Sequence, residues 1–121
     1  MTQLSKLIGF LVLIALCTQS CNTATNTDKP VAVSVAQPLS SYTVELEYFF
    51  VDPEWMRRGV GSYLYLATCA YYGSQKRKRL EFYADRHARD FYHHMGARCI
   101  AMVQAETSIH PPLPFFEHWL H

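Results

Sequence analysis

A short basic turn, Arg57-Arg58-Gly59-Val60-Gly61, holds the residue types that most clearly predict chemistry in this sequence. It lies between a strand-like stretch and a stretch with helical spacing. Backbone amides point outward from the first turn of a helix, the helix dipole favours negative charge there, and glycine lets a ligand approach closely. The two arginines add donors suited to phosphate. The turn therefore predicts a site for a phosphate or pyrophosphate ligand held by backbone amides.

A strand hairpin and a helix are predicted to position this turn. Residues 42–51 are rich in aromatic and β-branched residues and lack Gly and Pro, so they predict a strand that Asp52-Pro53 ends. Residues 31–36 alternate valine with small residues, and a turn over 37–41 would make the two strands an antiparallel hairpin. Behind the basic turn, helical spacing up to about Gly73 predicts a helix whose apolar positions are Val60, Tyr63, Leu64, Ala67, Ala70 and Tyr71.

The rest of the chain predicts two more strands and a short helix. The basic run 75–79 favours a solvated loop over a nucleic-acid or acidic-lipid patch. Residues 80–84 predict a buried strand, and Asp85 resembles an N-cap for a helix over 86–95 that Gly96 ends. Residues 97–103 predict another strand. The last stretch, 109–120, carries three prolines and predicts irregular structure with at most a short edge strand or final turn.

Length and composition limit the chain to one small domain. It has 121 residues, half of them apolar, and a net charge of +1. This composition is typical of a globular protein and gives no general case for nucleic acid as a partner. Four cysteines without a Cys-x-x-Cys pair and six scattered histidines predict no metal site.

The first 21 residues predict a signal-like segment. The apolar run from Leu7 to Cys17 is short for a membrane-spanning helix and closer to the core of a signal peptide. Cys21 resembles the attachment cysteine of a bacterial lipoprotein. These features predict a membrane-attachment segment over 1–21, a polar linker over 22–30 and a folded domain over 31–121. A buried N-terminal helix and a start codon placed too early are the alternatives, so export, membrane attachment and a cytoplasmic location all stay open.

The order of motifs resembles the GNAT superfamily of acetyl-CoA-dependent N-acetyltransferases. The turn Met56-Arg57-Arg58-Gly59-Val60-Gly61 is similar to its strand-to-helix motif, with Met56 in place of the usual Gln or Arg, and Phe91 to Ala97 is similar to its second motif. The resemblance covers about residues 31–120, and residues 108–114 look like one bacterial branch. It implies an α/β (α+β) fold, a mixed and mostly antiparallel sheet with helices on both faces.

The resemblance also implies roles for individual residues. The amides of Arg57 to Gly61, with Ser62, would hold the pyrophosphate of coenzyme A. Main-chain groups of Phe50 and Val51 would pair with the pantetheine arm like an added strand. Asp85 occupies a position where many members contact that arm. Tyr92 occupies the position of the acid that protonates the departing thiolate. Glu45 or Glu47 could serve as the base.

The implied activity is transfer of acetyl from acetyl-CoA to an amine by direct attack, without a metal. The acceptor is not identified by the sequence. The signal-like run stands where members have an N-terminal strand and helices, so the resemblance implies a truncated domain. Two alternatives follow: a non-catalytic, membrane-tethered module that binds coenzyme A or is only structural, and a homodimer that exchanges strands to complete the fold.

Overall fold

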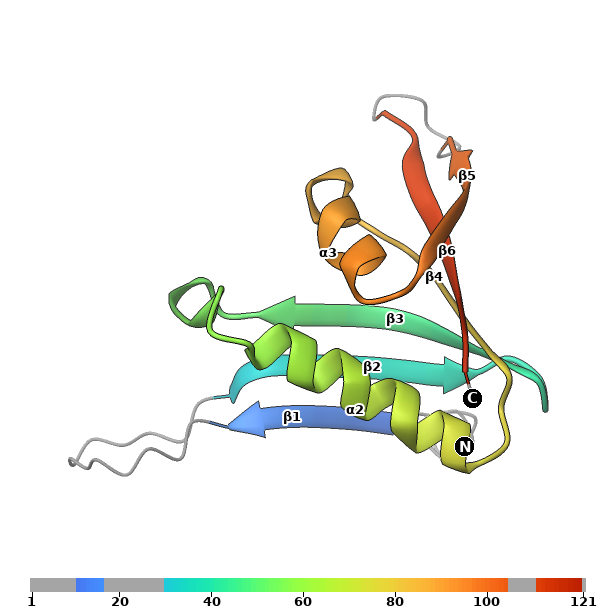
Figure 1. The fold of residues 1–121 in the computed structure, drawn as a ribbon, viewed down its shortest axis with the longest axis horizontal. Coiled ribbons are helices and arrows are strands. Elements are labelled where there is room, and N and C mark those ends of the chain that lie inside the picture. The colour runs from blue at the N-terminus through green and yellow to red at the C-terminus, as the bar shows by residue number, and fades with distance from the viewer. Residues whose placement is uncertain (1–10, 17–29, 105–110, 121) are drawn as a thin grey trace, which may run out of the picture.

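The computed structural model describes residues 11–16, 30–104 and 111–120. They form one six-stranded sheet in the order β1-β2-β3-β4-β6-β5 (Figure 1). The strands are β1 Leu11–Leu16, β2 Pro30–Pro38, β3 Thr43–Val51, β4 Arg79–Tyr83, β5 Arg98–Val103 and β6 Leu113–Trp119. The helices are η1 Pro53–Trp55, α2 Val60–Ser74, η2 Arg86–Ala88 and α3 Arg89–His94. The predicted α+β fold with a mixed, mostly antiparallel sheet is confirmed.

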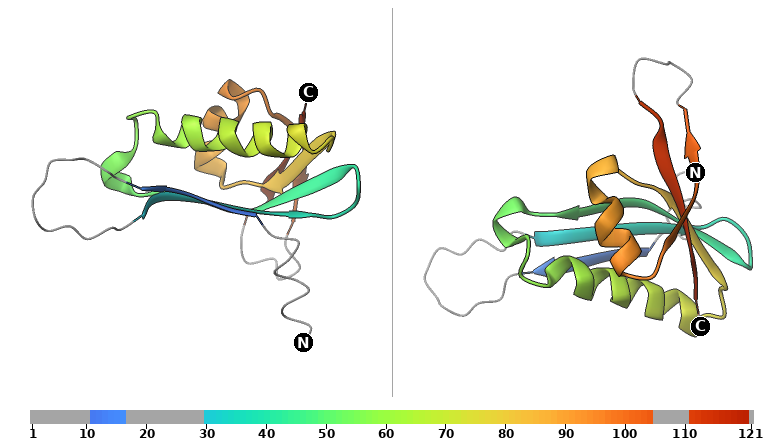
Figure 2. Two further views of the ribbon diagram at one scale, coloured as in Figure 1. Left: turned by 90° about the horizontal axis from the view of Figure 1, so that it is seen from below. Right: turned by 45° about the horizontal axis from the view of Figure 1, so that its top comes forward.

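The sheet opens between its two central strands. β3 and β4 are its one parallel pair, and they pair only where Thr43–Glu45 meets Arg79–Glu81. Beyond this point β1–β3 and β4–β6 separate, and α3 lies between the two halves (Figure 1). Figure 2 shows α2 and α3 on the same side of β1–β3, so the predicted helices on both faces are not observed in the described residues.

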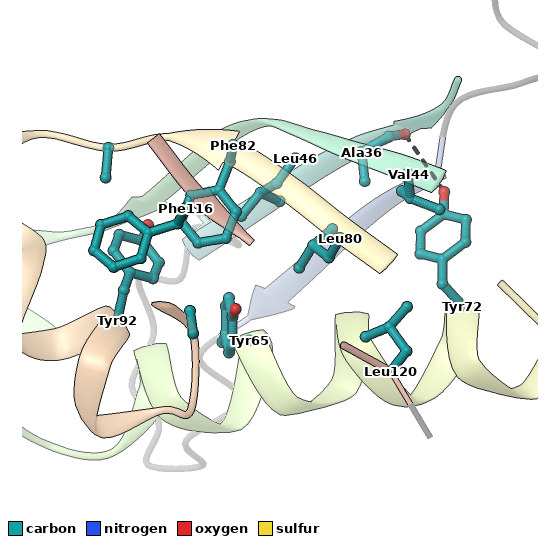
Figure 3. Packing of buried hydrophobic residues seen from close by; sticks show 12 residues of the cluster. Ala36, Val44, Leu46, Tyr65, Tyr72, Leu80, Phe82, Tyr92, Phe116 and Leu120 are labelled. Carbon is teal, nitrogen blue, oxygen red and sulfur yellow. Dashed lines mark hydrogen bonds between the residues drawn. The ribbon is translucent and has the colours of Figure 1, made fainter. Parts of the chain in front are cut away.

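The core is an aromatic cluster between the helices and the sheet. Tyr65 and Tyr72 of α2 are almost fully buried, as are Phe82 of β4 and Phe116 of β6. Tyr92 of α3 packs on Phe82 and Phe116 with ring centroids 4.6 and 5.6 Å apart. Figure 3 shows Tyr92, Phe82 and Phe116 together at one end of the cluster and Tyr72 at the other end, where its hydroxyl donates to the Ala36 carbonyl at 3.5 Å. One continuous core therefore holds α2 and α3 on the same face.

Small residues on β2 face the core side of the sheet, where α2 packs. Ala32, Ser34 and Ala36 alternate along the strand and are all buried. The Ser34 and Thr68 hydroxyls lie 2.9 Å apart, and Thr68 also donates to the Leu64 carbonyl at 2.9 Å. Because the one Thr68 proton goes to Leu64, we infer that Ser34 is the donor between the two hydroxyls.

The buried face of α2 differs from the predicted one. Leu64, Tyr65, Thr68 and Tyr72 are buried, whereas Tyr63 is 71% exposed and Tyr71 is 39% exposed. The predicted helix itself is confirmed at Val60–Ser74. The predicted buried face was wrong. The helix contains no charged residue, so no polar face in the sequence marks the side that faces solvent.

Residues 11–16 of the N-terminal apolar run form a strand of the sheet. β1 pairs antiparallel with β2 in a register from Leu11↔Ala36 to Ala15↔Ala32. A signal-peptide core outside the fold, and a domain lacking an N-terminal strand, are therefore not supported. A short apolar run is compatible with a signal, a helix or a buried strand, and periodicity alone does not separate them. Cys21 and residues 22–29 of the predicted linker lie outside the described residues. No described helix is long and apolar enough to cross a membrane.

The C-terminal stretch also differs from its prediction. β6 is a regular strand between β4 and β5, and it pairs antiparallel with both. The prolines at 111 and 112 precede it, and Pro114 lies at its second position, beyond the last β4 partner at Phe115. Proline therefore costs few ladder hydrogen bonds there. The other predicted elements are confirmed within a few residues, although the helix after Asp85 begins as the 3₁₀ turn η2.

Candidate active site

A β-bulge in β3 decides which side chains face the helices. Leu46 is opposite Ala36 and Tyr48 is opposite Val35, so Glu47 is the extra residue. Val44 and Leu46 are buried on the helix side before the bulge. After it the odd-numbered Phe49 takes that side, with ring centroids 6.1 to 6.3 Å from Tyr65, Phe91 and Tyr92. Tyr48 and Phe50 stack on each other and are exposed.

A cavity of about 460 Å³ lies where the end of β3, the start of α2 and α3 meet. Its lining comes from two segments that are separated in the sequence. One runs from the end of β3 through the basic turn to the first turn of α2, and the other is η2 with the start of α3: Phe49, Val51, Met56, Arg57, Gly59, Gly61, Ser62, His87, Ala88, Phe91 and Tyr92.

The basic turn has the backbone geometry that an anion site needs. Arg57 has φ of 64° and Gly59 has φ of 84°, both in the left-handed region. Gly59 is the N-cap of α2, and its carbonyl accepts from the Tyr63 amide at 3.0 Å. The amides of Val60, Gly61 and Ser62 precede the first such helix bond, and the first turn holds no acidic residue.

The two glycines of the turn serve different purposes. A Cβ on Gly59 would meet nothing within 4 Å, which leaves open space beside the turn. A Cβ on Gly61 would lie 3.3 Å from Val51 Cγ2 and 3.6 Å from Phe91 Cζ. Gly59 therefore supplies the left-handed conformation, and Gly61 lets α2, β3 and α3 approach one another.

The two arginines of the turn point in different directions. Arg57 lines the cavity. The Arg58 guanidinium instead lies over the Trp55 ring, 4.8 Å from its centroid. This is a cation–π contact, so Arg58 braces the loop in front of α2 and contributes positive charge from outside the lining.

Tyr92 lines the same cavity as the basic turn. Its side chain is 7% exposed, and burial raises the pKa of its hydroxyl to about 12. No described residue is shown in a hydrogen bond with this hydroxyl, and no fully buried polar side-chain atom of the described residues lacks a partner. We infer that the hydroxyl reaches the open space of the cavity as a protonated donor.

Glu45 and Glu47 lie at the opening of the sheet, outside the cavity lining. Glu45 is opposite Glu81 at the last paired position of β3 and β4. Burial, with the nearby charges of Glu47 and Glu81, raises the pKa of Glu45 above its ordinary value. Glu47 at the bulge is exposed. Both belong to the side of β3 that the helices do not cover.

The structure brings together about half of the predicted site residues. Val51, Arg57, Gly59, Gly61, Ser62 and Tyr92 share the cavity, whereas Phe50, Arg58, Val60 and Asp85 are not in its lining. The Asp85 carboxylate accepts from the His87 amide at 2.7 Å and so caps η2.

Five lining residues received no site role in the sequence analysis: Phe49, Met56, His87, Ala88 and Phe91. Phe91 was part of the second motif but received no role. His87 and Ala88 could have been found from the cap at Asp85, which turns the next residues toward the cavity. Phe49 could not, because nothing in the sequence marks the bulge. Among the described residues no group of three His, Cys, Asp or Glu could hold a metal.

Sequence comparison identifies a family. A model of the family described as "Acetyltransferase (GNAT) domain" matches residues 6–96, which is most of the chain. A search of curated proteins gives no significant match.

Solved structures with the same fold are distant in sequence. A GNAT-family acetyltransferase from Elizabethkingia anophelis with acetyl-CoA bound is 13% identical, with a TM-score of 0.73 over 98% of this chain and 82% of that one. A protein from Desulfovibrio desulfuricans described as an acetyltransferase of the GNAT family is 16% identical, with a TM-score of 0.76 over 99% and 75%. An N-acetyltransferase from Lactobacillus plantarum is 17% identical, with a TM-score of 0.68 over 76% of this chain and 62% of its own. At these identities the likeness establishes the fold alone.

Proposed function

Because the chain belongs to the GNAT acetyltransferase family, we propose that it transfers an acetyl group from acetyl-CoA to an amine by direct attack. The observation that carries this proposal is one cavity lined both by an amide-rich, cationic turn and by a protonated tyrosine. The turn suits a pyrophosphate, and the tyrosine suits a leaving thiolate. Acetyl-CoA contains both groups, joined by a long pantetheine arm.

We assign the coenzyme A pyrophosphate to the amides of residues 57–61, with Ser62 and the Arg57 side chain. The pantetheine arm would run along β3 past Val51 and Phe50. β3 pairs with β4 only as far as Glu45, so that edge of the strand has backbone groups free of the β4 ladder. An extended amide-containing arm can add to such an edge as a strand would. Asp85 would act indirectly, by holding His87 and Ala88 in place at the cavity wall.

The proposed reaction is a single direct transfer of the acetyl group from sulfur to nitrogen. The amine nitrogen attacks the thioester carbonyl carbon, the C–S bond breaks, and the departing thiolate takes the Tyr92 proton. The nitrogen loses its proton to a carboxylate, for which Glu45 is the first candidate and Glu47 the second. A raised pKa makes Glu45 the stronger base, and it lies where β3 and β4 separate. The acceptor would then approach from the side of the sheet opposite the helices.

Acetyl-CoA binding can be tested by calorimetry on the full chain with a matched pair of variants at Gly59. Gly59→Ala and Gly59→Glu impose the same left-handed strain, and neither side chain meets the protein at its Cβ. Only the Glu variant places a negative charge beside the proposed pyrophosphate site. We expect wild type and Gly59→Ala to bind acetyl-CoA and Gly59→Glu to lose at least tenfold in affinity, about 1.4 kcal/mol.

The outcomes separate catalysis from binding alone. Equal affinity of the two Gly59 variants would contradict the proposed pyrophosphate position. A folded wild-type chain that binds no acetyl-CoA would contradict the function. Binding without acetyl transfer to any member of a primary-amine panel would favour a non-catalytic coenzyme A-binding module.

A further inference from the structure

We propose that Phe49 sets the length of the acyl group that the cavity accepts, admitting acetyl and rejecting longer straight chains. This inference rests on the proposed function, because it concerns the acyl end of the same cavity. Phe49 is absent from the motifs of the sequence analysis. Its place follows from the bulge at Glu47 and from the ring contacts that surround it.

The bulge is what turns Phe49 toward the cavity. In a regular strand, side chains on one face recur every second residue, so Val44 and Leu46 would be followed on the helix side by Tyr48 and Phe50. The extra residue shifts this alternation by one. Phe49 and Val51 therefore line the cavity, while Tyr48 and Phe50 are exposed.

Phe49 lines the cavity together with Phe91 and Tyr92. Its ring centroid lies 6.3 Å from that of Tyr92, so a thioester next to the Tyr92 hydroxyl would have the Phe49 ring nearby. Phe49 makes edge-on contacts with Tyr65 at 6.1 Å and Tyr92 at 6.3 Å, and its ring lies 6.2 Å from that of Phe91.

The surrounding rings have little freedom to give way. Tyr65 is fully buried, and its hydroxyl is hydrogen-bonded to His118 Nδ1 at 2.9 Å. Phe91 Cζ lies 3.6 Å from where a Cβ on Gly61 would be, so the ring lies close to the first turn of α2. Close-packed interiors resist added volume, and extra methylenes next to the carbonyl would have to displace Phe49 against these neighbours.

The expected selectivity is large enough to measure. One methylene in an apolar pocket changes discrimination by about 10- to 200-fold. Butyryl-CoA carries two methylenes more than acetyl-CoA and the same coenzyme. We therefore expect wild type to bind acetyl-CoA at least tenfold more tightly than butyryl-CoA.

The test compares the two ligands on three proteins by calorimetry. Phe49→Ala removes the ring, and we expect it to shift the ratio of butyryl-CoA to acetyl-CoA affinity at least tenfold toward butyryl-CoA. Tyr48→Ala is the matched control, since it removes an exposed ring one residue away on the other side of β3. We expect its ratio to equal that of wild type. If thermal melting shows that Phe49→Ala is unfolded, Phe49→Leu takes its place, with a smaller shift in the same direction.

Failure of this inference is distinguishable from failure of the proposed function. A wild type that binds acetyl-CoA and butyryl-CoA equally, or a folded Phe49 variant with an unchanged ratio, overturns the inference and leaves the function standing. A wild type that binds neither ligand overturns the proposed function itself.

Discussion

The most consequential residue for the proposed chemistry is Tyr92, because its surroundings fix its protonation state. Its ring packs against Phe49, Phe82, Phe91 and Phe116. This apolar cluster disfavours the charged phenolate, and burial raises the pKa to about 12. The hydroxyl therefore keeps its proton at neutral pH, so it can donate that proton to the sulfur as the C–S bond breaks.

Replacing Tyr92 with Phe tests this role with little change in volume. We expect the acetyl-CoA affinity to stay within about threefold of wild type and the turnover number to fall by about 10²- to 10⁴-fold, the usual contribution of a general acid. The measurement is thiol release with a primary-amine acceptor found by screening. The control is His94→Gln, an exposed neighbour on the same helix, which should keep wild-type turnover. Full turnover in Tyr92→Phe would exclude the tyrosine as the acid.

The two carboxylates near the sheet opening can be separated by their pH dependence. A base works as its carboxylate, so kcat/KM should fall as the pH drops through its pKa. For Glu45 that pKa is raised above its ordinary 4.5 by burial and by the charges of Glu47 and Glu81. The fall should therefore occur at a higher pH than for an ordinary Glu. Glu45→Gln should abolish most activity. Glu47→Gln should keep activity, and because it removes a charge that raises the pKa of Glu45, the fall in kcat/KM should move to lower pH. The reverse pattern would make Glu47 the base.

At the scale of elements, the contact between α2 and β2 orients the helix that begins at the proposed anion site. The hydroxyl pair of Ser34 and Thr68 is buried among small residues of β2. A polar pair in such a place orients the helix, because any rotation of α2 would leave one hydroxyl without a partner. This pair also explains why the buried face of α2 includes Thr68 and excludes the more apolar Tyr63.

Thr68→Val keeps the shape of the side chain but leaves the Ser34 hydroxyl buried without an acceptor. We expect a loss of about 1–3 kcal/mol in the free energy of unfolding, measured by urea denaturation. The double variant Ser34→Ala with Thr68→Val removes both hydroxyls, so it should be more stable than the sum of the single changes predicts. Strict additivity would mean that the two hydroxyls do not interact.

The elements were more predictable than their faces. Strand and helix positions followed from local composition, because aromatic and β-branched runs, an Asp cap and terminal glycines act within a few residues. The bulge at Glu47 did not follow from local composition. Residues 48–50 are all aromatic, so apolar rings would be buried whichever of the two strand faces turned toward the core. Pairing with β2 selects one alternation, and that selection puts Phe49 rather than Phe50 in the cavity. Most site residues of the basic turn were therefore predicted, whereas Phe49, whose side depends on the register of β3, was missed.

At the scale of the whole molecule, the two halves of the sheet are stabilised in different ways. In the half formed by β4, β5 and β6, Glu117 joins the three strands through Arg79 and Arg98, each 3.0 Å away. These hydrogen bonds hold the pKa of Glu117 below its ordinary value. The other half carries α2 across β1 and β2, with β1 as its edge strand. The site lies where the halves separate, so its geometry depends on both.

The edge strand β1 gives a direct test of whether the N-terminal apolar run belongs to the fold. A chain that begins at residue 11 keeps β1, and a chain that begins at residue 17 loses it and exposes the whole edge of β2. An unpaired edge loses its ladder hydrogen bonds and can pair with other molecules. We therefore expect the shorter chain to melt at least 10 °C lower and to aggregate in size-exclusion chromatography, and the longer one to behave as the full chain does. If both melted alike and bound acetyl-CoA equally, the run would be dispensable for the fold, as a removable signal would be.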